Sequence, residues 1–497
     1  MGFKQATWDE PLLIELGKEG RCGYSLPKVD GDLESVVKLI PERLLRKDIP
    51  LPSLSEPQVV RHFVRLSQMN YCVDLGMYPL GSCTMKYNPK IAERIASDPH
   101  LTRLHPYQPV ETVQGILEIM YNLSKMLAEI TGTAKVTLAP AAGAHGEFVG
   151  CLIIRAYIKD KGELKVRNEM LIPESAHGTN PASAVMAGFK VVKIPTDEEG
   201  LVDIEALKAA ISQRTAGMML TVPNTLGLFE RRVEEISKII HEAGGLMYYD
   251  GANMNALLGR VRPGDMGFDI VHMNLHKTFA TPHGGGGPGS GPLGVSKELV
   301  DFLPVPLVDY DGEKYFLNYN IPKTIGRIKG FYGNISVLIK AYTYILMVGS
   351  DKLKEISNQS VLASNYLLSN LNSSMYLLPY SKGIPRKHEF VVSAKPIQMK
   401  SGVRAMDIAK SLLDLSLHAP TIYFPLIVDE ALMIEPTETE PMENLDEYAK
   451  ALNTIAHQAE EDPQRIIDAP INTSIKRLDE VKASHPLTMK LNWRGLK

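Results

Sequence analysis

The clearest periodic pattern in the chain lies between residues 111 and 132. Apolar residues recur there at positions 113, 116, 117, 120, 123, 126, 127 and 130. A recurrence close to 3.6 residues predicts an amphipathic helix. Gly132 follows the last apolar position and is expected to end this helix, because glycine readily adopts the left-handed conformation found at helix C-termini.

Short apolar runs alternate with further helical patterns in the part of the chain that follows. Six runs read as buried strands, at residues 169–173, 190–194, 217–222, 245–249, 269–273 and 292–296. Helical patterns lie between several of these runs, at residues 147–159, 203–213 and 231–243. This alternation predicts an α/β fold, with a mostly parallel central sheet covered by helices on both faces.

The whole chain is predicted to have four parts. Residues 1–90 are rich in proline and loop signals, and we interpret them as an N-terminal arm. Residues 91–335 form the large domain around the sheet. A long helix is predicted at residues 334–348, and residues 336–465 form a smaller α+β C-terminal domain. Residues 466–497 form a polar C-terminal tail.

Composition and charge narrow the classes of protein to which the chain can belong. Of its 497 residues, 44% are hydrophobic and 22% are charged, as in an ordinary globular protein. The net charge of −3 and the absence of a basic block give no indication of a nucleic-acid partner. No uncharged apolar stretch reaches the roughly 18 residues of a membrane span. The four cysteines form no CxxC pair and the chain start lacks an apolar signal core, which favours a cytoplasmic location.

Several segments with unusual polar residues follow the predicted strands directly. They are PESAHGTNPAS (173–183), PNTLG (223–227), DGANMNA (250–256) and NLHKTFATPHGGGG (274–287), and APAAGAHGE (139–147) precedes a helix. Ligands of open α/β sheets collect at the carboxyl ends of the strands. We therefore expect these segments to converge on one pocket.

Two charged residues in these segments could carry chemistry. Lys277 precedes four consecutive glycines, which leave room around it; it is either a surface lysine or a partly desolvated amine that forms a Schiff base. Asp250 ends an apolar strand and requires a partner, which is either a helix N-terminus or a protonated pyridine nitrogen. At roughly 4 Å and an effective dielectric constant near 20, the second pair interacts by about 4 kcal/mol. A ring protonated in this way lets pyridoxal phosphate accept electrons.

Two further features fit the same cofactor, although each alone is weak. The small residues Ala142, Gly143 and Ala144 precede a helix, whose free N–H groups could bind a phosphate. The ring of His177 could stack on a flat cofactor or serve as a hydrogen-bonded structural group.

Two other motifs fail on inspection, and no metal site is expected. Gly289, Gly291 and Gly294 spell GxGxxG, but they follow glycines instead of a strand and enclose a proline. His272 and His276 would lie about 13 Å apart on a strand, too far to share a metal ion.

The chain resembles the pyridoxal-phosphate enzymes of fold type I and, within them, the P-protein family of the glycine cleavage system. The resemblance is carried by residues 78–89 (YPLGSCTMKYNP), 174–184, 248–259, 271–295 and 418–440 (with MIEPTETE). Single-chain members are about twice as long. The length therefore resembles the cofactor-bearing subunit of the split form, subunit 2.

The resemblance implies a role for each candidate site residue. Lys277 would bind pyridoxal phosphate covalently, with Asp250 at its ring nitrogen. Ala252 would lie beneath the ring and His177 against its other face. The remaining roles are phosphate binding by Ala142, Gly143 and Ala144, a position near the ring for Thr225, and either proton handling or packing for His276. Cys83 would lie near the pocket entrance, as an inert thiol more readily than as a redox group.

The resemblance also implies a reaction and partners. The reaction is decarboxylation of glycine, with transfer of the aminomethyl group to the lipoyl arm of the H-protein. The partner is a P-protein subunit 1 without cofactor, in an α2β2 assembly. Two alternatives stay open. One is another fold type I activity, an aminotransferase or an amino-acid decarboxylase that holds a substrate carboxylate through Arg327 or Arg404. The other is a non-catalytic scaffold subunit, against which Lys277 and Asp250 argue.

Overall fold

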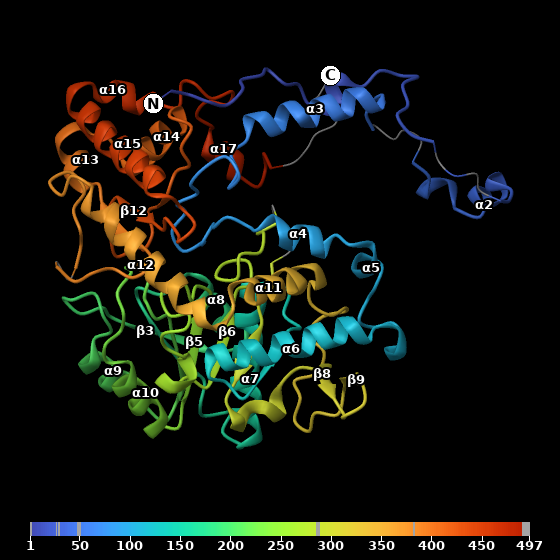
Figure 1. Cartoon of the computed structure of the whole chain (residues 1–497), viewed down its shortest axis with the longest axis vertical. Coiled ribbons are helices and arrows are strands. Elements are labelled where there is room, and N and C mark those ends of the chain that lie inside the picture. Colours follow the sequence, from blue (N-terminus) through green and yellow to red (C-terminus); the bar gives the residue numbers. More distant parts are fainter. Residues whose placement is uncertain are drawn as a thin grey trace. The chain divides into compact units, whose positions relative to one another are not determined.

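The computed structural model describes residues 2–25, 27, 30–46, 51–284, 289–380 and 383–489. The chain divides into two compact units, labelled by element in Figure 1. The smaller unit comprises Met1–Cys72, Lys410–Ser416 and Asp468–Lys497, and the larger one Val73–Ala409 and Leu417–Ile467. The arm, two domains and tail expected from the sequence stay a prediction.

A seven-stranded sheet forms the centre of the larger unit, in the order β1-β7-β6-β5-β4-β2-β3. Its strands are β1 (Lys135–Thr137), β2 (Glu169–Pro173), β3 (Lys190–Ile194), β4 (Thr215–Leu220), β5 (Leu246–Gly251), β6 (Ile270–Met273) and β7 (Leu293–Val295). Strands β3, β2, β4, β5 and β6 run parallel, and only β7 is antiparallel to its neighbours β6 and β1. The prediction of a mostly parallel α/β sheet is confirmed.

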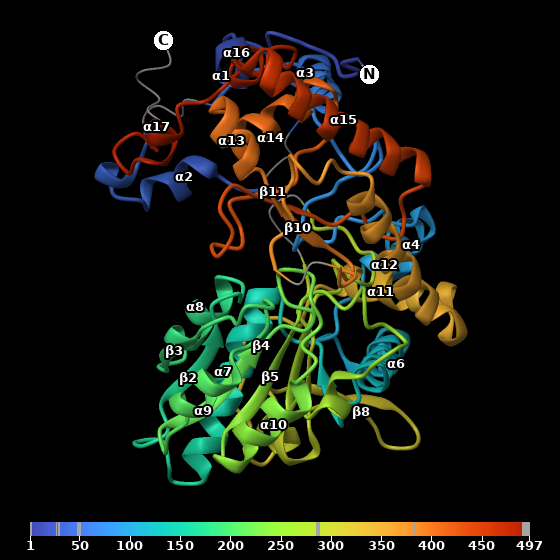
Figure 2. The same cartoon turned by 90° about the vertical axis from the view of Figure 1, so that its left-hand side faces the viewer.

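Helices cover both faces of this sheet because successive strand residues point to opposite sides. On β5, Met247 and Tyr249 belong to one apolar core, and Leu246 and Tyr248 to another. The first core packs against α6 (Gln114–Thr131), α10 (Val233–Glu242) and α11 (Ile335–Val348). The second packs against α7 (Gly143–Asp160) and α8 (Thr179–Met186). Figure 2 shows α6 on one side of the strands and α7 and α8 on the other.

The predicted elements agree with the observed ones to within a few residues. Helix α6 ends at Thr131, and Gly132 follows it with φ 70°, in the left-handed region expected of it. The largest difference is at the start of α7, which begins at Gly143 instead of residue 147; β5 extends to Gly251 instead of 249, and β4 stops at Leu220 instead of 222. The other helices of the larger unit are α4 (Lys90–Ala96), α5 (Pro99–Thr102), α9 (Ile204–Ala210), α12 (Leu353–Ser369), α13 (Lys395–Ser401), α15 (Met442–Glu461) and α16 (Pro463–Ile467).

A second, antiparallel sheet lies in the C-terminal part of the larger unit, in the order β10-β12-β11. Its strands are β10 (Phe390–Ser393), β11 (Thr421–Ile422) and β12 (Ala431–Ile434), and β8 (Leu307–Tyr310) pairs separately with β9 (Tyr315–Asn318). Helix α15 packs against both α12 and α13. The pairing of β10 with β12 brings side by side the apolar strand that follows Glu389 and the one that precedes Glu435.

The regular elements described in the smaller unit are helices, and much of the rest of this unit is irregular. It contains α1 (Leu13–Leu16), α2 (Leu33–Lys38), α3 (Glu56–Met69) and α17 (Glu480–Ser484), while α14 (Ala405–Asp414) spans the boundary between the units. Glu10 anchors α3 by hydrogen bonds of 2.7 Å to His62 Nδ1 and to the guanidinium of Arg65. No helix in the described ranges is both long and apolar enough to cross a membrane.

Candidate active site

One cavity of about 270 Å³ gathers almost all of the residues that the sequence singled out. It lies beyond the carboxyl ends of β4, β5 and β6, where parallel sheets bind their ligands. Its lining includes Gly143, Ala144, His177, Thr225, Asp250, Ala252, His276 and Lys277. Ala142 is absent from the lining but directly precedes Gly143 as the N-cap residue of α7.

Asp250 is buried at the end of β5, with only 3% of its surface exposed. Its Oδ1 accepts a hydrogen bond of 3.1 Å from the N–H of Ala252. This bond closes a local turn and does not cap a helix, because the next helix, a short 3-10 helix, begins only at Pro263. The helix-cap alternative for Asp250 is therefore wrong, and the carboxylate faces the cavity.

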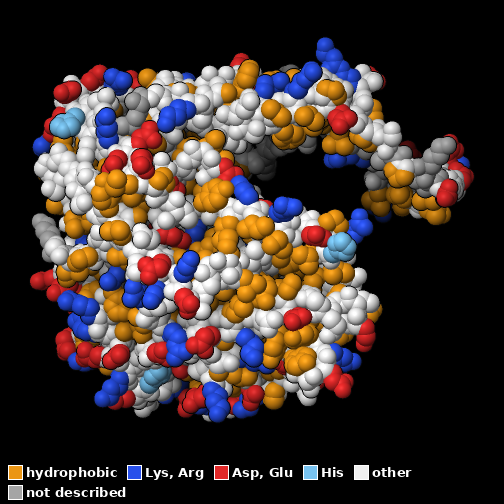
Figure 3. Space-filling view, viewed as in Figure 1, with side chains coloured by type: hydrophobic (Ala, Val, Ile, Leu, Met, Phe, Trp, Pro, Cys, Tyr) orange, Lys and Arg blue, Asp and Glu red, His pale blue; other side chains and the backbone are white. Residues whose placement is uncertain are grey.

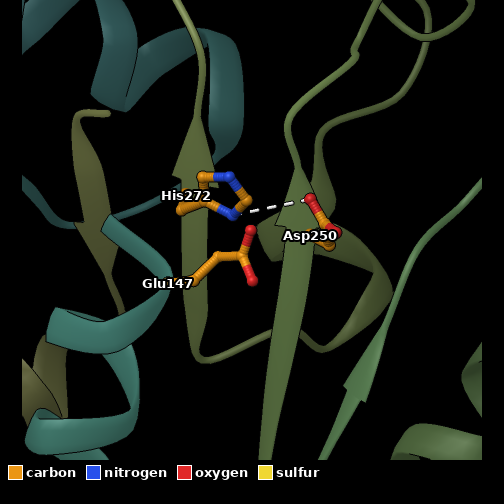
Figure 4. A group of neighbouring side chains, drawn as sticks. All are labelled: Glu147, Asp250 and His272. Carbon is orange, nitrogen blue, oxygen red and sulfur yellow. Dashed lines mark ion pairs between the residues drawn. The ribbon is translucent and has the colours of Figure 1, made fainter. Parts of the chain in front are cut away.

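A second carboxyl group, Glu147, lies beside Asp250 and was missed by sequence reasoning. Glu147 comes from α7, Asp250 from β5 and His272 from β6, and Figure 4 shows the three side chains pointing toward one another. Burial, and then the charge of Asp250, raise the pKa of Glu147 to about 8. Two adjacent buried carboxylates resist double ionisation. Glu147 therefore carries the proton near neutral pH.

Two further neighbours of Asp250, His272 and Asn180, are uncharged. Burial lowers the pKa of His272 to about 4, and its Nδ1 lies 2.8 Å from the hydroxyl of Tyr248 and 3.6 Å from Asp250 Oδ1. With its amide nitrogen turned toward the carboxyls, Asn180 donates to Asp250 at 2.9 Å and to Glu147 at 3.0 Å. The cluster can thus present one negative charge to the cavity, on Asp250.

Lys277 lies in the turn after β6, half-buried, and its Nζ donates a hydrogen bond of 2.7 Å to the carbonyl of Ser82. Part of the glycine segment packs beside it, although residues 285–288 lie outside the described residues. A Cβ atom on Gly289 would lie 2.7 Å from the ring of His276. One on Gly291 would lie 2.1 Å from the carbonyl oxygen of Ala142. These two glycines allow the loop to approach the site closely.

The start of α7 has the form of an anion site. The first N–H groups of a helix have no partner within it and carry the positive end of the helix dipole. A Cβ on Gly143 would lie 2.5 Å from the Asn274 side chain, which also lines the cavity. The absence of a side chain at position 143 therefore keeps this helix end open.

The histidines of the cavity are neutral at physiological pH. Burial lowers the pKa of His276 to about 3, and His276 Nδ1 accepts the N–H of Ser290 at 3.2 Å. Burial also lowers the pKa of His177, whose Nδ1 lies 2.9 Å from the hydroxyl of Thr179. Thr179 in turn donates to Glu147 at 3.0 Å, which links His177 to the carboxyl cluster. His276 lies beyond β6, so the strand spacing assumed for His272 and His276 was wrong.

The other singled-out residues have clear positions. The Thr225 hydroxyl donates to the Ser175 carbonyl at 2.5 Å. Cys83 lines the cavity, and burial raises the pKa of its thiol. Arg404 is exposed and lies 3.4 Å from Glu430, while the guanidinium of Arg327 stands over Tyr107 and Tyr319. Neither arginine lines the cavity, and its described lining contains no other arginine.

Residues 81–86 (GSCTMK) bind three acidic residues that sequence reasoning also missed, and one of them, Glu389, lines the cavity. The N–H of Ser82 donates to Glu389 at 2.7 Å, and the N–H of Thr84 donates to Glu435 at 3.0 Å. The buried Lys86 donates to Glu438 at 2.5 Å and to the carbonyl of Thr278, the residue after Lys277. Glu435 directly follows an apolar strand, much as Asp250 ends one. The argument that a carboxylate at the end of a buried strand requires a partner, applied to residues 433–435 (MIE), would therefore have found it.

Comparisons with known proteins agree with this architecture. Residues 29–314 match the family described as glycine cleavage system P-protein, and residues 356–476 match the glycine dehydrogenase C-terminal domain. A probable glycine dehydrogenase (decarboxylating) subunit 2 of Thermococcus onnurineus (strain NA1) is 59% identical over 100% of this chain and 98% of that relative.

Solved structures share the fold. An inhibitor-bound glycine decarboxylase (P-protein) of the glycine cleavage system has a TM-score of 0.71 and 20% identity, over 85% of this chain and 95% of that chain. A Lactobacillus brevis glutamate decarboxylase has a TM-score of 0.63 and 14% identity, over 88% of this chain and 96% of that chain. The chain has the fold of fold type I pyridoxal-phosphate enzymes and belongs to the glycine cleavage system P-protein family.

Proposed function

We propose that this chain is the cofactor-bearing subunit 2 of a glycine dehydrogenase (decarboxylating). It would release CO2 from glycine and transfer the aminomethyl group to the lipoyl arm of the H-protein. The observation that carries the proposal is the position of Lys277, Asp250 and the open N-terminus of α7 on one cavity. The intact pair of lysine and aspartate argues against a purely structural subunit.

The residues present fit pyridoxal phosphate. The Lys277 amine can form a covalent carbon–nitrogen link, and the buried Asp250 can pair with a protonated ring nitrogen. The backbone of Ala142, Gly143 and Ala144 can hold the phosphate at the start of α7. Glycine is needed at position 143 because a side chain there would clash with Asn274. Ala252 and His177 supply the two faces of the ring site, with Thr225 at its edge. When bound, the cofactor accepts the electron pair that loss of CO2 leaves behind.

The protein's own groups set the charge of the site. Glu147, His272 and Asn180 add no charge around Asp250, so that its negative charge is directed at the ring nitrogen. His276 is the candidate for handling a proton at the cavity wall: it is neutral at physiological pH, and because its Nδ1 accepts the N–H of Ser290, its Nε2 carries the ring hydrogen. Burial of these groups excludes water, which strengthens each interaction.

Partners of the chain are part of the proposal: a subunit 1 in an α2β2 assembly, and a lipoylated H-protein. The support is exposed apolar surface. In the smaller unit, Val60, Phe63 and Val64 expose one face of α3. In the larger unit, Ile91 and Ile95 of α4 and Leu346 and Met347 of α11 are exposed, and Figure 3 shows hydrophobic side chains over these two helices. Apolar patches of this kind mark sites of protein association. A cytoplasmic location is proposed from the four free cysteines.

The proposal is tested by glycine-dependent exchange of radiolabelled carbon dioxide in the reconstituted enzyme. We expect exchange that requires both pyridoxal phosphate and lipoylated H-protein. Exchange of the label without H-protein, or transamination of glycine, would instead favour an independent decarboxylase or aminotransferase. The 59% identity to a probable glycine dehydrogenase (decarboxylating) subunit 2 over the whole chain favours the main reading over those activities.

A further inference from the structure

Two buried carboxyl groups lie directly opposite each other at the end of the small antiparallel sheet. Glu389 precedes β10 and Glu435 follows β12. The ladder pairs Phe390 with Ile434, so the next pair along it is Glu389 with Glu435. One oxygen atom from each of these two carboxyls and one ring nitrogen of His388 all lie within 4.8 Å of one another. Like charges at opposite positions destabilise a sheet.

No positive charge compensates this pair directly. Within the described ranges, no lysine or arginine forms an ion pair with Glu389 or Glu435, and neither ring nitrogen of His388 has a hydrogen-bond partner. Burial lowers the pKa of His388 to about 3, which keeps it neutral. The other titratable groups that act on the pair are the amines of Lys277 and Lys86 and the thiol of Cys83.

The pair therefore retains a proton. Burial, and then the proximity of Glu435, raise the pKa of Glu389 well above its usual value. Burial raises the pKa of Glu435 to about 7, against hydrogen bonds from Asn253 and Thr84 that favour its ionised form. Asn253 and Thr84 hold Glu435 in place, while Glu389 lines the cavity.

A single residue, Ser82, connects this pair to the reactive lysine. The N–H of Ser82 donates to Glu389 and the carbonyl of Ser82 accepts from Lys277 Nζ, both at 2.7 Å. Ser82 has φ 67° and Thr84 has φ 44°, in the left-handed region that residues other than glycine rarely adopt. These conformations aim both N–H groups at the two carboxyls, and place Glu389 beside the reacting centre.

The proposed reaction consumes one proton in the cavity that Glu389 lines. The bond between the glycine α-carbon and its carboxylate breaks, CO2 leaves, and the electron pair forms a carbon–sulfur bond to one sulfur of a disulfide. The sulfur–sulfur bond breaks, and its electrons stay on the second sulfur. The disulfide is reduced and the glycine carbon is oxidised. The departing thiolate must be protonated, and protonation by a positioned acid accelerates such steps by about 10²- to 10⁴-fold.

We propose that Glu389 and Glu435 share one proton and that Glu389 delivers it to the sulfur that leaves the disulfide acceptor. The inference rests on the proposed function. Glu389 is the catalytic acid, Glu435 is a positioning residue that keeps it protonated, and solvent restores the proton after the product has left.

The test compares Glu389→Gln and Glu435→Gln with the matched control Glu430→Gln. Glu430 is also buried, precedes β12 at its opposite end, and accepts the N–H of Ala405, a bond that glutamine can keep. In the reconstituted holoenzyme, we expect aminomethyl transfer to fall by about 100-fold or more in Glu389→Gln. The wild-type rate should decline as the pH rises and the pair loses its proton. This decline should vanish in both pair variants and persist in Glu430→Gln.

Infrared difference spectra give a readout that is independent of turnover. A protonated-carboxyl band should be present in the wild type and in Glu430→Gln, and should weaken in each pair variant. A Glu389→Gln enzyme with the wild-type rate and pH profile would overturn the inference, as would an unchanged infrared band. A stoichiometric divalent metal in the purified holoenzyme would also overturn it, because a cation would neutralise the pair. Failure of the proposed function is distinguishable, because the wild type itself would then not transfer the aminomethyl group.

Discussion

Replacement of Asp250 by asparagine tests the electrostatic reasoning at the ring nitrogen. The change removes one charge and preserves shape, and the surroundings cannot replace that charge. Glu147 holds a proton because its pKa is raised to about 8, and His272 is neutral because its pKa is lowered to about 4. Asp250 is only 3% exposed, so water screens it little.

The magnitude follows from Coulomb's law. A charge pair about 4 Å apart at an effective dielectric constant near 20 interacts by about 4 kcal/mol. This corresponds to a shift of about 3 units in the pKa of the ring nitrogen. If all of it is expressed in the barrier to decarboxylation, the rate falls by about 10³-fold.

The assay is glycine-dependent CO2 exchange at saturating cofactor, with cofactor binding followed by absorbance. Asp250→Asn should still bind pyridoxal phosphate and lose about three orders of magnitude in rate. The matched control is Glu147→Gln, which replaces a carboxyl that is already protonated and should change the rate at pH 7 only a few-fold. Equal losses in the two variants, or a near-normal rate in Asp250→Asn, would refute the reasoning.

Three further predictions concern binding and stability. Gly143→Ala should weaken pyridoxal-phosphate binding without unfolding the protein, since its Cβ would lie 2.5 Å from Asn274; equilibrium titration checks this, and unchanged affinity would contradict it. Lys86→Met should lower the free energy of unfolding by about 3–5 kcal/mol, because it leaves the carboxylate of Glu438 without its cationic partner. The control is Lys90→Met, which breaks the exposed pair with Asp74 and should cost less than about 1 kcal/mol. Denaturant titrations measure both changes. Glu147 takes up a proton on folding because its pKa is raised from 4.5 to about 8, so the stability that this residue confers falls as the pH rises through that window. Glu147→Gln should therefore become more stable relative to the wild type from pH 5 to pH 8. A stability difference that stays constant over this range would count against the assignment.

The α/β sheet was predictable because its signal is local. Residues 169–173 are buried along their whole length and read in the sequence as an almost continuous apolar run. Residues 190–194 pair with them and keep an apolar majority, although Lys190 and Lys193 interrupt the run. Convergence of Asp250 and Lys277 was predictable as well, because parallel neighbouring strands end at the same edge of a sheet.

Local patterns do not show which acidic side chains lie together. Glu147 lies within a helix, and only the fold shows that it points at Asp250. Glu389 and Glu435 meet because β10 and β12 pair over a long separation in the sequence. The backbone of Ser82 and Thr84 that binds them is an outcome of tertiary structure, and no residue type signals it. The assumed strand geometry of His272 and His276 failed because β6 ends at Met273, before His276.

The central claim is that Lys277 carries the cofactor, and borohydride reduction tests it most directly. The holoenzyme is reduced, digested, and the peptide that bears the pyridoxyl group is identified by mass spectrometry, with Lys277→Ala as the control. The account predicts a stoichiometric label on Lys277 alone, and loss of both the label and the visible absorbance band in Lys277→Ala. A label on another lysine, or a Lys277→Ala protein that keeps the band and turns over glycine, would contradict it.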